Sequence, residues 1–167
     1  CSSDLAGSRI INANTFGASA HKLAGSAYSL EEIIAAGIAN CKRACAPYGA
    51  LAALDVGPLG ELLEPSGTLA FEDAVAEYAR IVKAGVAAGA DLIFFETFTD
   101  LYELKAALLA AKENSTLPVL ASMSFEAGGR TFTGCTVESF GVTARGLGAD
   151  AVGINCSLGP KEIFPMA

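Results

Sequence analysis

The chain has 167 residues, of which 52% are hydrophobic and 17% charged, a balance that excludes an intrinsically disordered protein. The formal net charge is −7 and the basic residues form no cluster, which argues against nucleic acid or an anionic membrane as a partner. The five cysteines are irregularly spaced, unlike a secreted disulfide framework, so we expect a cytoplasmic protein.

The two ends of the chain lack the polar tails that are common at natural termini. The first residue is Cys1, and the last residues, Phe164–Ala167, resemble a helix that has barely begun. We therefore interpret residues 1–167 as the central part of one domain of a longer parent protein.

Short β-rich runs alternate with longer helical segments along the whole chain. The runs predict five strands, over Ile10–Asn14, Leu51–Val56, Leu92–Glu96, Val119–Ser124 and Ala151–Cys156. Strands that alternate with helices of this length are typical of parallel β-α units.

Three of the intervening helices carry clear signals. Ser29 and Glu32 have the spacing of a capping box, which predicts that a helix begins just after Ser29. Residues 71–88 place apolar side chains at the spacing of a buried helical stripe. Asp100 is a favourable N-cap for a helix over residues 101–112. A Gly-Ala-Asp turn occurs twice, at residues 89–91 and 148–150, which indicates a weak internal repeat.

A doubly wound sheet and a (β/α)8 barrel both fit this alternation. Two observations favour the barrel: polar residues follow every predicted strand, and no Gly-x-Gly-x-x-Gly motif opens the first helix. A complete barrel needs roughly 250 residues, so this chain has room for about five of the eight strands. We therefore predict an α/β fold that is a partial TIM barrel.

In such barrels the active site lies at the carboxyl ends of the strands. The residues at these positions are small, polar and rich in oxygen atoms, with one thiol. They include Asn14, Asp55, Glu96, Ser122 and Asn155-Cys156. This set suits an amino-acid-like ligand with a metal ion or a nucleophile nearby.

Four segments, in the right order, resemble the homocysteine S-methyltransferase family. These segments are Asn14–Ala18, Asp91–Asp100, Ser124-Phe125 with Gly129–Thr131, and Gly153–Pro160. They are similar to the second, fourth, fifth and sixth strands of that family, so the chain would hold about strands 2 to 6. The helix after Asp100 and the Ser157–Pro160 segment are most like the homocysteine-binding domain of cobalamin-dependent methionine synthases.

The resemblance implies a homocysteine methyltransferase that makes methionine, with methylcobalamin on another domain as the methyl donor. Cys156 would be the first of three zinc ligands, and two further cysteines would lie beyond Ala167. Glu96 would bind the substrate ammonium group, with Thr97, Asn14 and Asn155 as further substrate-binding residues. The chain alone would then be inactive, and its open sheet edges predict self-association.

Other readings of these residues remain open at this point. The methyl donor could be S-methylmethionine or betaine, or the chain could be a catalytically incomplete fragment. A Schiff-base aldolase is disfavoured because no lysine ends a predicted strand. Glu96 could simply cap a helix. Cys41 and Cys45 could chelate a metal at i, i+4 spacing, although packing is the better interpretation. His21 is expected to be a solvated helix residue, because no partner is apparent in the sequence.

Overall fold

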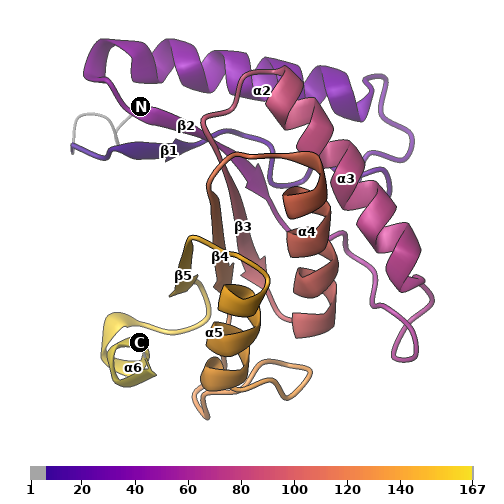
Figure 1. The fold of residues 1–167 in the computed structure, drawn as a ribbon, viewed down its shortest axis with the longest axis vertical. Coiled ribbons are helices and arrows are strands. Elements are labelled where there is room, and N and C mark those ends of the chain that lie inside the picture. The colour runs from indigo at the N-terminus through magenta and orange to yellow at the C-terminus, as the bar shows by residue number, and fades with distance from the viewer. Residues whose placement is uncertain (1–6, 167) are drawn as a thin grey trace.

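The computed structural model describes residues 7–166 and contains a sheet of five parallel strands in the order β1-β2-β3-β4-β5 (Figure 1). The strands are β1 (Ile10–Asn12), β2 (Leu51–Val56), β3 (Leu92–Phe98), β4 (Val119–Met123) and β5 (Ala151–Ile154). Every pair of neighbours is parallel, so the prediction of parallel β-α units is confirmed.

Helices connect the strands and pack together on the sheet, with α3 beside α4 (Figure 1). They are α2 (Leu30–Cys45), α3 (Phe71–Ala87), α4 (Leu101–Asn114), α5 (Val137–Gly146) and α6 (Pro160–Ile163), with 3-10 turns at Ala46–Tyr48 and Phe164–Met166. Within residues 7–166, no helix has both the length and the apolar character needed to cross a membrane.

The alternation of side chains along each strand separates two faces of the sheet. On β2, Leu54 and Val56 belong to the apolar core under the helices, whereas Asp55 points to the opposite face. On β3, Phe95 belongs to that core and Glu96 points away from it. The face opposite the helices is the inner face of a closing barrel, so the fold is the predicted partial (β/α)8 barrel.

The predicted helix starts are confirmed by hydrogen bonds at the caps. The Ser29 hydroxyl accepts from the Glu32 amide, and the Glu32 carboxylate accepts from the Ser29 amide at 2.8 Å. At α4, the Asp100 carboxylate accepts from the Tyr102 amide at 3.1 Å. Asp100, and not Glu96, therefore caps the helix that follows β3.

The repeated Gly-Ala-Asp turn has the same structural role at both positions. Gly89 and Gly148 adopt left-handed backbone conformations, with φ of 85° and 83°, and each ends a helix. The Asp91 carboxylate then accepts from the Ala52 amide of β2, and the Asp150 carboxylate accepts from the Val119 amide of β4, both at 2.8 Å. Each aspartate thus fixes the start of one strand against its neighbour.

Several predicted boundaries are wrong by a few residues. Strand β1 ends at Asn12 because the chain turns there, with the Thr15 amide donating to the Ala13 carbonyl. Strand β3 continues to Phe98, beyond Glu96. Strand β5 ends at Ile154, before two residues with positive φ, Cys156 and Ser157. His21 is exposed, as predicted, but it lies in a turn and not in a helix, and its Nδ1 lies 2.7 Å from the Glu61 carboxylate, a partner that was not apparent in the sequence.

Candidate functional site

Polar side chains from all five strands form a belt across the inner face of the sheet, near the carboxyl ends of the strands. The belt residues are Asn12, Asp55, Glu96, Ser122 and Asn155. Successive members are neighbours: Asn12 and Glu96 both influence the pKa of Asp55, and Asn155 is hydrogen-bonded to Glu96 and Ser122. Parallel strands bring these residues together because their carboxyl ends meet at one edge of the sheet.

Asn155 joins the two halves of this belt. Its Nδ2 donates to Glu96 Oε2 at 3.2 Å, to Thr97 Oγ1 at 2.8 Å and to Cys156 Sγ at 3.4 Å. Its Oδ1 accepts from the Thr97 amide at 3.2 Å and from the Ser122 hydroxyl at 2.9 Å. One amide group therefore fixes the relative positions of a carboxylate, a hydroxyl and a thiol.

The backbone around these contacts is strained. Thr97 has φ of 64° and Cys156 has φ of 60°, values that a β-branched residue such as threonine rarely adopts. The register between β3 and β4 shifts between Phe95 and Phe98, so Thr97 lies in an irregular part of the strand. Conformations of this kind cost of order 1–3 kcal/mol each and cluster at functional sites. The hydrogen bonds from Asn155 to Thr97 hold this conformation in place.

Asp55 is the most unusual titratable group of the belt. Its side chain is buried, and one carboxyl oxygen, Oδ1, has no hydrogen-bond donor. Burial and the nearby negative charge of Glu96 raise the pKa of Asp55 to about 8. The acid is therefore mostly protonated at neutral pH.

Cys156 is exposed at the edge of the belt, where its Sγ lies 3.6 Å from Thr97 Oγ1. A thiol in this position is accessible to a metal ion or a substrate. Within residues 7–166, however, no three Cys, His, Asp or Glu side chains are arranged to hold a metal ion. The described residues therefore supply one soft ligand and do not form a zinc site by themselves.

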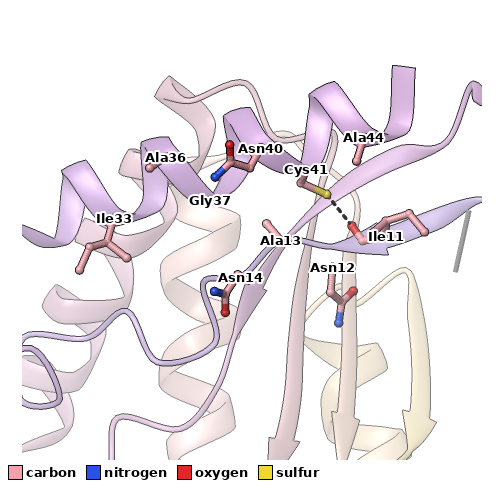
Figure 2. A pocket seen from close by; sticks show the side chains of 10 residues that line it. All are labelled: Ile11, Asn12, Ala13, Asn14, Ile33, Ala36, Gly37, Asn40, Cys41 and Ala44. Carbon is pink, nitrogen blue, oxygen red and sulfur yellow. Dashed lines mark hydrogen bonds between the residues drawn. The ribbon is translucent and has the colours of Figure 1, made fainter. Parts of the chain in front are cut away.

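Cys41 and Cys45 are buried in α2, with their sulfur atoms 3.8 Å apart. The Cys41 thiol donates to the Ile11 carbonyl of β1 (Figure 2), and the Cys45 thiol donates to the Leu51 carbonyl of β2, so the pair packs α2 against the sheet. The structure supports the packing interpretation over the metal-binding one.

Three of the four predicted substrate-binding residues, Glu96, Thr97 and Asn155, lie together beside the predicted metal ligand, Cys156. Asn14 does not join them by any hydrogen bond among the described residues. It lies just beyond β1, at a groove of about 370 Å³ between β1 and α2, and its side chain points away from the helix (Figure 2).

Asp55 and Ser122 belong to the strand-end set expected at the active site but had no individual role predicted, and Asn12 was not predicted at the site. Asp55 and Ser122 follow the pattern of polar residues at strand ends, which was the available signal. Asn12 is the last residue of the short strand β1. Its signal in the sequence is weaker: it is a polar residue directly after two isoleucines.

Comparisons with known proteins identify the family of the chain. The family model for homocysteine S-methyltransferase matches residues 5–167. Methionine synthases from Mycobacterium tuberculosis and Mycobacterium leprae are 36% and 34% identical over 80 residues, covering 45% of this chain and 7% of each relative. The chain thus matches only a small part of these curated relatives.

Solved structures share the fold. The metallated form of the Escherichia coli homocysteine methyltransferase MmuM superimposes with a TM-score of 0.76 at 21% identity, over 95% of this chain and 61% of that protein. The oxidized form gives a TM-score of 0.78 at the same identity, over 92% and 59%. From the match of the family model to nearly its whole length, we conclude that the chain belongs to the homocysteine S-methyltransferase family.

Proposed function

We propose that residues 1–167 are the central part of a homocysteine-binding barrel domain in a parent enzyme that methylates homocysteine to methionine. The observation that carries this proposal is the position of Asn155, which hydrogen-bonds both the Glu96 carboxylate, at 3.2 Å, and the Cys156 thiol, at 3.4 Å. An amino acid with a terminal thiol presents an ammonium group and a sulfur atom, and these two side chains complement them.

Glu96 is the proposed partner of the ammonium group. Its side chain is half-buried on the inner face, where a carboxylate interacts with a cation more strongly than it would in water. Asn155 donates to one of its oxygens and orients the carboxylate. Thr97, and in our proposal Asn14, line the space beside it.

Cys156 is the proposed first ligand of a zinc ion, and two cysteines of the parent protein outside this chain would complete the site. When bound, zinc coordinates the substrate sulfur and removes its proton, which matters because a free thiol has a pKa of about 8.5. The contribution of this chain is positional: the Asn155 amide and the Thr97 hydroxyl hold the Cys156 sulfur next to the ammonium pocket.

Methylcobalamin on another domain is the proposed methyl donor, which the similarity to two methionine synthases supports. We also propose a cytoplasmic location. The irregular spacing of the five cysteines, unlike that of a secreted disulfide framework, supports this proposal.

Glu96→Gln in the full-length parent protein tests the proposal. Removing the carboxylate should weaken homocysteine binding by about 1.5–3 kcal/mol, the range for a hydrogen bond to a charged group. Calorimetry measures the affinity, and metal analysis should find unchanged zinc because Glu96 is not a ligand. Unaltered homocysteine affinity in this variant would show that the ammonium group binds elsewhere.

A further inference from the structure

The proposed function uses Glu96 but leaves Asp55 without a role. The two carboxyl groups come from neighbouring strands, β3 and β2, and are within hydrogen-bonding distance of each other on the inner face. Two carboxylates at such a distance cannot both be ionised without a large electrostatic cost. The pair therefore needs either a proton or a cation.

The surroundings of Asp55 provide no permanent cation among the described residues. The Asn12 amide faces it from β1, and Glu96 faces it from β3. The Thr15 hydroxyl contacts only the Asp55 backbone, donating to its carbonyl at 2.8 Å and accepting from its amide at 3.1 Å. One side-chain oxygen of Asp55, Oδ1, is buried and accepts no hydrogen bond. An arriving cation would meet this unused acceptor beside the Glu96 carboxyl group.

We propose that Asp55 and Glu96 share one proton when the pocket is empty, and that the ammonium group of the substrate displaces this proton into solvent. This inference rests on the proposed function, because it names the exchange that occurs at the same ammonium site.

Charge balance explains why an exchange is favourable. The empty pair with one proton carries a single negative charge, and the ionised pair with an ammonium group carries the same net charge. The pocket thus never holds two uncompensated charges in a partly buried position. Burial and Glu96 place the pKa of Asp55 at about 8, so the proton is present at neutral pH and a nearby cation can remove it.

The exchange also predicts selectivity for amino acids that carry a positive charge on nitrogen. A ligand without an amino group cannot replace the proton, so it should bind weakly and release none. The Asp55–Glu96 pair is therefore a specificity determinant.

L-methionine is the suitable probe for the full-length parent protein, because it carries the ammonium group but has no thiol proton to release. Titration calorimetry in two buffers with different ionisation enthalpies counts the protons released on binding. For the unaltered protein we expect a release that approaches about one proton per ligand near pH 7 and disappears above about pH 9. Over the same range the affinity should rise with pH below about 8, by at most about tenfold per pH unit.

Asp55→Asn mimics the neutral acid, so this variant should bind L-methionine with no proton release and no rise in affinity between pH 6 and 8. Glu103→Gln is the matched control. Glu103 is also a buried acid with a raised pKa, caused by burial, but it contacts the Leu59 amide and the Tyr78 hydroxyl away from the belt. Proton release in this control should equal that of the unaltered protein.

The outcomes separate the two proposals. If the unaltered protein binds L-methionine across pH 6 to 8 without releasing a proton, the exchange is overturned and the proposed function still stands. This result does not depend on the folding of any variant. Equal proton release by Asp55→Asn and the unaltered protein also overturns it. If neither L-methionine nor L-homocysteine binds at any pH, both proposals fail.

Discussion

Asn155→Asp should destabilise the site in a strongly pH-dependent way, because it places a carboxylate opposite Glu96. The amide nitrogen of Asn155 lies 3.2 Å from Glu96 Oε2, and this contact would change from attraction to repulsion, while the hydrogen bond donated to the Cys156 sulfur at 3.4 Å would be lost. The acceptor contacts with the Thr97 amide and the Ser122 hydroxyl would remain. The substitution therefore isolates the donor function of this side chain.

The size of the effect follows from two competing costs. Two unit charges 3.2 Å apart repel by about 5 kcal/mol at an effective dielectric constant of 20. Protonating an aspartate of ordinary pKa at pH 7 costs about 4 kcal/mol, which is cheaper, so the introduced acid should bind a proton. We expect a loss of about 2–4 kcal/mol in the free energy of unfolding at pH 7.

The sign of the pH dependence is fixed by this raised pKa. The pKa of the introduced carboxyl group is higher in the folded state than in the unfolded state. Below the unfolded-state pKa the group is protonated in both states, and the folded state is then not penalised for binding a proton. The stability of the fold therefore falls as the pH rises towards 7. The loss should therefore shrink to about 1–2 kcal/mol at pH 5. Urea unfolding of residues 1–167 at fixed protein concentration, monitored by circular dichroism, measures this loss at each pH.

Asn114→Asp is the matched control. Asn114 also donates through its amide, to the Ala110 carbonyl at 2.8 Å, but at the end of α4 and away from the belt. A new charge at a helix C-terminus should cost about 0.3–1 kcal/mol, with little change between pH 5 and pH 7. Equal losses for the two variants, with the same pH dependence, would refute the hydrogen-bond network described for Asn155.

Three further predictions concern the fold and the metal. Gly85→Ala should lower the free energy of unfolding in urea by about 1–3 kcal/mol, because the added Cβ would lie 2.4 Å from Leu54 Cδ2. Gly146→Ala, whose Cβ would have no atom within 4 Å, should leave this free energy unchanged or raise it. The opposite order of stabilities would contradict the packing described for Gly85. Asp91 has a lowered pKa despite partial burial, because Lys42 and the Ala52 amide bind it, so its stabilisation should be present above the unfolded pKa of about 4 and be lost as pH falls further. In the Asp91→Asn variant, the free energy of unfolding measured with urea should depend less on pH across that range. Residues 1–167 alone should bind no stoichiometric zinc and should self-associate, and a monomer with one tightly bound zinc by metal analysis and light scattering would contradict this.

The parts of the fold that the sequence predicted well depend on local interactions. The helix starts at Ser29 and Asp100 were predictable because a cap and its partner lie within three residues of each other. Strand β2 was predicted at its correct limits because its apolar run is bounded by turn residues. The limit of β5 was wrong because Cys156 and Ser157 adopt positive φ. The limit of β3 was wrong because the strand continues irregularly through Thr97, whose positive φ is supported by a hydrogen bond to the distant residue Asn155.

The site was predictable where a motif resembled a family and unpredictable where it depends on register. Glu96, Asn155 and Cys156 belong to such motifs, and the structure brings them together. The pairing of Asp55 with Glu96 depends on how β2 and β3 align, with Asp55 opposite Phe94, and no pattern in either segment specifies that alignment. The same argument applies to His21 and Glu61, which lie 40 residues apart in sequence and 2.7 Å apart in space.

The two chemical tasks of the proposed site are divided differently between this chain and the rest of the parent protein. The carboxyl pair and its neighbours Asn12 and Asn155, which we propose to recognise the ammonium group, all lie within residues 7–166. The metal site has only Cys156 here, and its geometry depends on residues outside the chain. Substitutions at Asp55 or Glu96 should therefore change amino-group recognition without any change in zinc content. Substitution of Asn155 should change both amino-group recognition and thiol activation, because Asn155 contacts the Glu96 carboxylate and the Cys156 sulfur at the same time.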